Sequence, residues 1–173
     1  MQTPASDPLL TVARIMLRIA MGMTLAGAAA CLLASPVVYV FREQAVRSLA
    51  SAGAPPETIW GIIGVLVMLS AGLVLSFLFL RQLARIVATV GEGDPFVPVN
   101  ADRLGAMGWL TLAGQILWIP VSILASWIEH VTDHVRHDFD LPFAGFLLAV
   151  VLFVLARVFR KGAEMRAELE GTV

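Results

Sequence analysis

Three histidines lie in one short polar segment whose side chains suit a metal ion. His130 and His134 are four residues apart, and His137 follows three residues later, so a helix would bring all three to one face. Asp133 adds a carboxylate, and neutral imidazoles with a carboxylate suit zinc, copper or nickel. Such spacing alone is a weak signal, and a solvated polar loop beside lipid headgroups explains the same residues. A divalent transition metal at this segment is therefore a hypothesis, held beside the simpler interpretation of a solvated loop.

The rest of the sequence offers little for catalysis. A single cysteine, Cys31, excludes a disulfide framework and a cysteine-based metal cage. No nucleophile and base, and no pair of buried acids, can be assembled from the pattern, so we predict that the protein is not an enzyme and has no catalytic residue or cofactor. Twelve basic and thirteen acidic side chains give a net charge of -1, which argues against direct binding of nucleic acid.

The distribution of charged residues predicts membrane-spanning helices. Hydrophobic residues make up 58% of the 173 residues, only 14% are charged, and the mean hydropathy is +0.84. Four uncharged stretches of 23, 23, 25 and 16 residues separate the charged clusters, and roughly 20 helical residues cross a bilayer core. The sequence therefore predicts an all-α integral membrane bundle of four transmembrane helices in one domain, 1–173. The expected helices are about 15–41, 58–81, 104–128 and 141–160, with outer loops 42–57 and 129–140, a cytoplasmic loop 82–103 and a cytoplasmic tail 161–173.

The basic residues predict the orientation. With the N-terminus inside, nine of the twelve Lys and Arg residues fall in cytoplasmic segments and three in outer segments. The positive-inside rule then places both termini in the cytoplasm, in a multi-pass protein of the inner membrane. The first apolar run continues past Cys31 to Phe41, so we expect a membrane helix there rather than a cleaved signal.

The four uncharged stretches contain no ionisable side chain except Cys31 and Tyr39. Ion-coupled transporters and proton relays normally need Asp, Glu, Lys, Arg or His in the membrane, so a transport role has little support. Gln115 is the one large polar residue, and we expect it to form a hydrogen bond between helices. The hydroxyl groups of Thr24, Ser70 and Thr111 can bond to their own helix backbones.

The segment between the second and third membrane helices is the most patterned. Leu83, Ile86, Val87 and Val90 have helical spacing, which predicts that the second helix continues as an amphipathic extension. Glycine and proline then end it, and Asn100 is expected to cap a helix that starts at Ala101.

This segment carries a resemblance to a known family. Residues 93–104, followed by Gly108 and Trp109, resemble the signature of the bacterial "domain of unknown function 2975" membrane family. The matching positions are Gly93, Pro95, Phe96, Asn100, Arg103, Leu104 and Gly108. The resemblance extends over essentially the whole chain and implies four membrane helices, but no established activity. Family members are often encoded beside a small helix-turn-helix regulator, which implies such a regulator as a partner.

We therefore expect a sensory or regulatory membrane partner of a small cytoplasmic DNA-binding regulator, with the matching residues as contacts. The competing interpretation is that this segment only ties the second and third helices together. A small-molecule transporter or channel subunit, and an outer-loop metal-binding protein, remain as alternatives. The lipid bilayer is an expected partner, and a homo-oligomer remains open.

Overall fold

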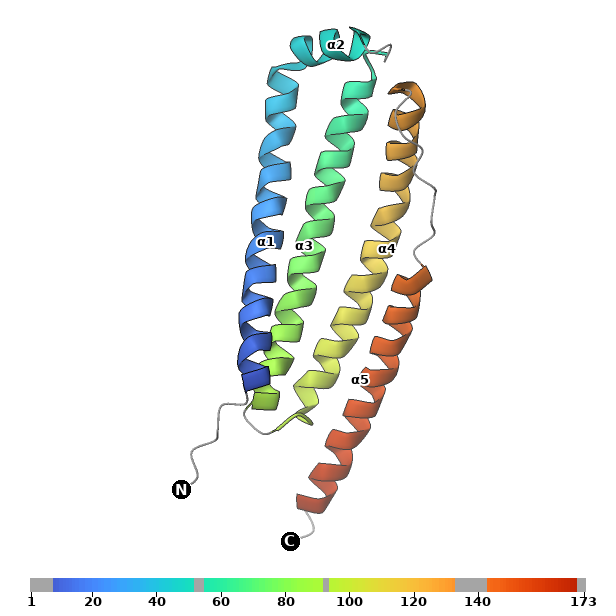
Figure 1. Cartoon of the computed structure of the whole chain (residues 1–173). Helices are drawn as coiled ribbons and strands as arrows, with labels where there is room; N and C mark the ends of the chain where they lie inside the picture. The colour runs from blue at the N-terminus through green and yellow to red at the C-terminus, as the bar shows by residue number, and fades with distance from the viewer. Residues whose placement is uncertain (1–7, 52–54, 92–93, 133–142, 171–173) are drawn as a thin grey trace.

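The computed structural model describes residues 8–51, 55–91, 94–132 and 143–170, and within these ranges it has five α-helices (Figure 1). Four are long and one is short. In chain order they are α1 (Pro8–Val40), α2 (Arg42–Ser51), α3 (Thr58–Gly91), α4 (Pro98–Thr132) and α5 (Phe143–Glu170).

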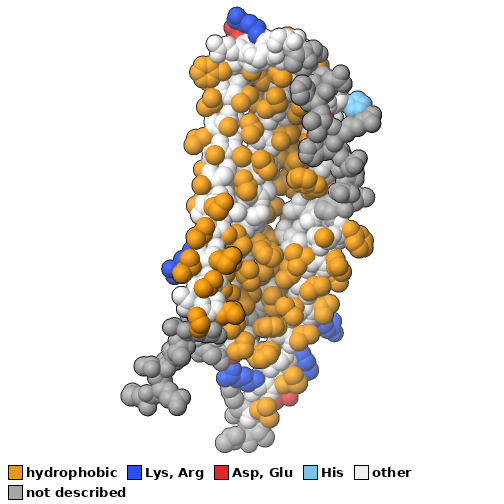
Figure 2. Space-filling model, in the orientation of Figure 1, with side chains coloured by type: hydrophobic (Ala, Val, Ile, Leu, Met, Phe, Trp, Pro, Cys, Tyr) orange, Lys and Arg blue, Asp and Glu red, His pale blue; other side chains and the backbone are white. Residues whose placement is uncertain are grey.

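Each of the four long helices is long and apolar enough to cross a membrane. The longest, α4, has 35 residues, which is about 52 Å at 1.5 Å per residue, against about 30 Å for a hydrocarbon core. Hydrophobic side chains cover most of the visible face of these helices, while charged ones gather toward the ends (Figure 2). The prediction of four membrane helices is confirmed at the level of helix length and composition.

Two segments predicted as loops are largely helical. The segment 42–57 contains α2, a polar helix with an exposed pair between Glu43 and Arg47 (3.6 Å), which lies across the end of α1 (Figure 1). The segment 82–103 is mostly filled by the end of α3 and the start of α4, as the amphipathic pattern after residue 82 predicted. The predicted cap was wrong: α4 begins at Pro98, because proline is favoured in a helix's first turn, and Asn100 lies inside the helix.

The long helices lie side by side in chain order. The extensive helix contacts join α1 to α3, α3 to α4 and α4 to α5, so that α1 and α5 form the two edges of a row (Figure 1). The start of α1, the turn between α3 and α4, and the end of α5 lie at one end of this row, which we call the turn end. The nine basic residues assigned above to the cytoplasmic side belong to the helix segments nearest this end, whereas Arg42 and Arg47 lie at the opposite end.

The fourth long helix, α5, is shifted along its own axis relative to α4. Gln115, in the middle of α4, packs against Gly145, the third residue of α5. At the other end Phe96 packs against Gly162, and α5 continues eight residues beyond that contact. The last turns of α5 therefore project past the turn between α3 and α4 (Figure 1).

The contact between α1 and α3 uses a face of small residues. Gly27 lies against Leu73, and Ala28 is buried and accepts a hydrogen bond from the Ser70 hydroxyl (3.0 Å). A Cβ at Gly22, by contrast, would have no atom within 4 Å. The expectation that Ser70 bonds its own helix was wrong, because the nearby α1 carbonyl offers it an acceptor. Thr24 and Thr111 bond their own helices as expected.

Candidate functional site

Asn100 is the centre of the polar contacts at the turn end. Its side chain is completely buried, at 0% exposure. The amide nitrogen donates to the Thr89 hydroxyl oxygen of α3 (2.8 Å) and to the Pro95 carbonyl oxygen of the turn (2.9 Å). The amide oxygen accepts a bond from Arg103 Nη1 (2.9 Å). The amide therefore uses both of its N–H donors and its oxygen, as a buried polar group must.

Two of these partners extend the contacts into the backbone of α3. Arg103 Nη1 also donates to the Arg85 carbonyl oxygen (3.1 Å), and the Thr89 hydroxyl donates to the Ile86 carbonyl oxygen (2.7 Å). We call Arg85, Thr89, Pro95, Asn100 and Arg103 the polar clasp. It fixes the start of α4 against the end of α3 through side-chain bonds on both sides of the turn.

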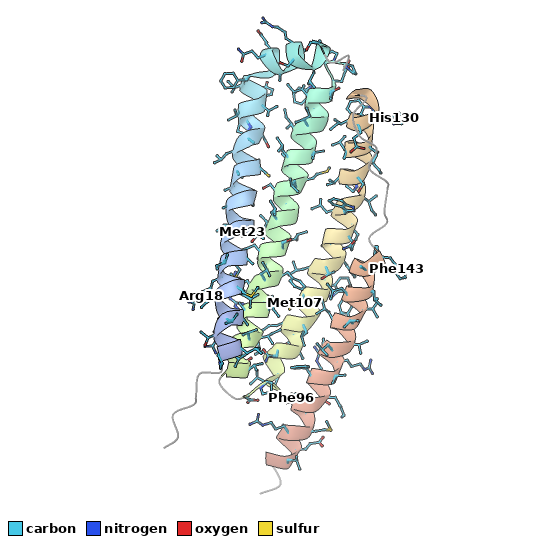
Figure 3. All side chains as sticks on the ribbon, in the orientation of Figure 1. Arg18, Met23, Phe96, Met107, His130 and Phe143 are labelled. Atoms are coloured by element: carbon cyan, nitrogen blue, oxygen red, sulfur yellow. The ribbon has the colours of Figure 1, made fainter. Side chains whose placement is uncertain are left out.

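Phe96 connects the same turn to α5. Its ring centroid lies 5.3 Å from that of Phe159, and its edge lies over Gly162, where an added Cβ would come within 2.9 Å of Phe96 Cδ1. Phe96 is 43% exposed, so part of the ring stays accessible (Figure 3). A side chain larger than hydrogen at position 162 would force this ring to move.

Two exposed ion pairs also join the turn to α5. Asp94 pairs with Arg166, and Asp102 pairs with Arg160 at 2.9 Å. All four side chains are partly or largely exposed, so each pair contributes at most about 1 kcal/mol.

An apolar cluster lies beneath the polar clasp. Leu104 and Met107 of α4 are buried with Ile86 of α3 and with Leu152 and Ala156 of α5. One turn further, Gly108 faces the Phe153 ring, and an added Cβ would lie 2.9–3.1 Å from three ring carbons. Three helices therefore meet at the turn end, and Gly108 leaves room for the Phe153 ring between α4 and α5.

The family comparison agrees with this local architecture. The sequence model of the family described as "Protein of unknown function (DUF2975)" matches residues 43–173. The chain belongs to this family. The match takes in α2 to α5 and leaves α1 outside, so it covers less of the chain than the sequence resemblance suggested. No curated protein and no solved structure matches the chain.

The structure brings together six of the seven predicted motif positions of this DUF2975 protein, and Gly93 lies outside the described residues. Pro95, Phe96, Asn100 and Arg103 form polar or aromatic contacts, and Leu104 and Gly108 pack in the interface with α5. The remaining partners were missed by sequence analysis. Thr89, Phe159 and Gly162 have common residue types without a motif of their own. Their roles come from the three-dimensional contacts, of Thr89 with Asn100 and of the other two with Phe96.

The histidine segment is only partly described. His130 is exposed in the last turn of α4, far from the turn end (Figure 3). Asp133, His134 and His137 lie outside the described residues. The metal hypothesis therefore stays a prediction.

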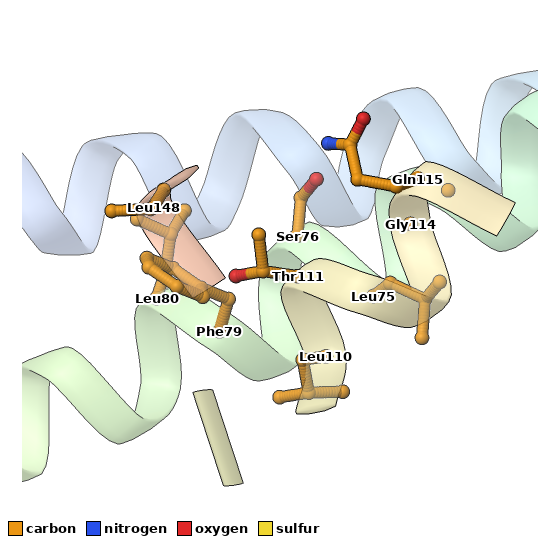
Figure 4. A pocket seen from close by; sticks show the side chains of 10 residues that line it. Leu75, Ser76, Phe79, Leu80, Leu110, Thr111, Gly114, Gln115 and Leu148 are labelled. Carbon is orange, nitrogen blue, oxygen red and sulfur yellow. The ribbon is translucent and has the colours of Figure 1, made fainter. Parts of the chain in front are cut away.

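Gln115 lies beside a pocket of about 360 Å³ between α3, α4 and α5 (Figure 4). Its amide packs directly on Gly145, and its buried Oε1 has no hydrogen-bond partner among the described residues. The hydroxyl groups of Ser76 and Thr111 also line the pocket, and its other lining residues are glycine or hydrophobic. The predicted hydrogen bond between helices is not seen among the described residues, and Gln115 instead packs against α5.

Proposed function

We propose that this protein is a regulatory protein of the cytoplasmic membrane that binds a small soluble DNA-binding protein at its turn end. In this proposal the turn end faces the cytoplasm, because nine of the chain's twelve basic residues belong to segments at that end. Both ends of the chain then lie in the cytoplasm. Retention at the membrane would keep the regulator away from its operators.

The observation that carries the proposal is the projecting end of α5. In α5 the uncharged length ends at Ala156, and the basic residues at positions 157, 160 and 161 follow it at the headgroup level in this proposal. Met165 and Leu169 lie beyond that length, four residues apart on one helix face, and are 51% and 73% exposed. In this proposal the two side chains form the apolar part of the contact surface for the partner.

The polar clasp supplies rigidity for this surface. Asn100 is buried and therefore cannot touch a partner directly, whereas Phe96 is partly exposed and packs against α5. Contacts from Phe96 and the two ion pairs connect the projecting helix to the turn. The two interpretations of the motif thus combine: the buried residues tie the helices together, and the exposed ones present the contact surface.

The proposal is tested by crosslinking in intact cells. A photo-crosslinking amino acid at position 169 of the full-length protein should capture a small DNA-binding protein, identified by mass spectrometry. With the crosslinker at position 96 instead, the double variant Met165→Ala/Leu169→Ala should capture at least about tenfold less of the partner than the unsubstituted protein, because the variant lacks the apolar anchor.

The matched control is Leu147→Ala, which truncates an equally apolar, exposed side chain of α5 within the membrane segment. It should leave the crosslink unchanged, and all variants should reach the membrane at the same level. Absence of any DNA-binding protein among the crosslinked species would contradict the proposal. So would full capture by the double variant.

A further inference from the structure

A second surface at the turn end differs from the projecting apolar one. A cleft of about 600 Å³ opens between α4 and α5, on residues not used by the polar clasp. Trp109 and Phe153 line one part of it, and Arg157, Arg160 and Lys161 line another. We propose that this cleft binds an anionic phospholipid, with its phosphate among the basic residues and an acyl chain along the aromatic pair.

The charges in the cleft are not balanced. Arg160 pairs with Asp102 at 2.9 Å, and Lys161 pairs with Glu164 at 3.2 Å. Arg157 has no ion pair within the described part of the chain. Three cations thus face two carboxylates, and one further negative charge would neutralise the third cation, Arg157. A phosphodiester supplies that charge, and basic clefts between membrane helices are suited to lipid headgroups.

The aromatic side chains select a lipid over a soluble anion. Trp109 is 68% exposed, and its ring meets Phe153 edge to face with centroids 5.4 Å apart. Tryptophan is enriched at the membrane interface, where its ring offers apolar contact area beside the polar headgroups. Gly105 and Ala156 have small side chains, which leave room beside the rings. A free phosphate would make no use of this apolar wall.

The position of the cleft along α5 matches the boundary of the bilayer. Arg157 is the first charged residue after the uncharged part of α5, and Arg160 and Lys161 lie one turn further out. Phe153 lies one turn deeper. The basic groups therefore occupy the headgroup level and the aromatic groups the acyl level. This order matches a phospholipid, whose phosphate lies outside its acyl chains.

The test measures lipid binding to the full-length, detergent-purified protein by native mass spectrometry. The probes are phosphatidylglycerol and phosphatidylcholine with identical acyl chains. Phosphatidylglycerol should bind at least about fivefold more tightly, which is the factor expected for one uncompensated basic residue at a membrane surface. Arg157→Gln should abolish this preference. Arg81→Gln, which removes an exposed arginine of α3 at the same end, should keep it.

Glycerol 3-phosphate separates a lipid site from a phosphate site. It carries a phosphate monoester, whose negative charge is at least that of the lipid phosphodiester, but no acyl chains, so at millimolar concentration it should leave phosphatidylglycerol bound. Trp109→Ala should weaken binding of both lipids, because both use the aromatic wall. Equal binding of the two lipids, an unchanged preference in Arg157→Gln, or displacement of the lipid by glycerol 3-phosphate would each overturn the proposal.

Discussion

The side-chain amide of Asn100, near the start of α4, donates a hydrogen bond to the hydroxyl of Thr89, near the end of α3. Eleven residues separate the two positions, and the whole turn between the helices is closed by this bond and by the bond to Pro95. The Thr89 hydroxyl in turn donates a hydrogen bond to the Ile86 carbonyl oxygen, so the chain of donors ends in the backbone of α3. A buried network of this kind stabilises one arrangement of the turn because every member is satisfied.

Replacing Asn100 should therefore destabilise the turn end. Asn100→Ala removes three hydrogen bonds at a buried position and leaves the Pro95 carbonyl and the Arg103 guanidinium without this partner. We expect a loss of about 1–3 kcal/mol, measured as a lower unfolding temperature of the purified protein in detergent. Ser48→Ala, which removes an exposed bond within α2, serves as the control. If Asn100→Ala unfolded at the same temperature as the wild type, the network would contribute nothing to stability.

Two glycines of α4, three residues apart, should respond oppositely to alanine. At Gly108 a Cβ would press into the Phe153 ring, so Gly108→Ala should cost about 1–3 kcal/mol. At Gly105 a Cβ would have no atom within 4 Å, and Gly105→Ala should be neutral or stabilise by up to about 1 kcal/mol. Thermal unfolding of both variants gives the comparison. Combining Gly108→Ala with Phe153→Leu should restore part of the loss, because the smaller side chain can move aside.

The bond from Ser70 to the Ala28 carbonyl should make a small contribution to the pairing of α1 with α3. Hydrogen bonds between membrane helices average about 0.6 kcal/mol, so Ser70→Ala should lower the free energy of unfolding by about that amount. Ser122→Ala removes a bond within α4 only and should have less effect. Steric trapping or chemical denaturation in mixed micelles would measure both. A loss well above 2 kcal/mol would point to repacking of the interface instead.

The ion pair between Asp102 and Arg160 should be weak and sensitive to salt. Both side chains are more than half exposed, so a double-mutant cycle with Asp102→Asn and Arg160→Gln should give a coupling of about 0.2–1 kcal/mol. Repeating the cycle in 1 M NaCl should reduce the coupling toward zero, since the screening length falls to about 3 Å. A coupling that persists at high salt would contradict this expectation.

The proposed orientation can be measured by cysteine labelling. In a Cys31→Ser background, a cysteine at Asp94 should react with a membrane-impermeant maleimide only after the cells are opened. A cysteine at Ser48, exposed in α2 at the opposite end, should react in intact cells. The reverse pattern would place the turn end outside and remove the basis for a cytoplasmic partner.

Much of the helical framework could be predicted because charge patterning in a membrane protein is a strong constraint. Lipid requires each spanning segment to satisfy its own backbone, so uncharged stretches of sufficient length become helices. The extension of α3 past residue 82 also followed from its apolar periodicity. The polar segment 42–57 was harder, because α2 has few apolar residues and its pattern resembles that of an exposed loop.

The turn motif was found in the sequence, but its geometry was not. Asn100 has the residue type of a helix cap, and a cap next to Ala101 was the simplest local interpretation. Its real partners, Thr89 and Arg103, become neighbours only when α4 begins at Pro98 and folds back on α3. Likewise, the contact of Gly162 with Phe96 depends on the displacement of α5, which no local pattern encodes.

Because the helices form a single row, lipid tails occupy the positions around their side chains that other side chains occupy in a globular core. In each long helix at most 17% of the most apolar 18-residue window is buried by protein. Lipid tails therefore fill most of the space around these side chains, and a change of acyl-chain length acts on this protein as a core substitution acts on a soluble one. The edge formed by α5 has the shortest uncharged part, residues 143–156 or about 21 Å, so a thick bilayer must thin there first, or Arg157 must extend its side chain to the headgroups.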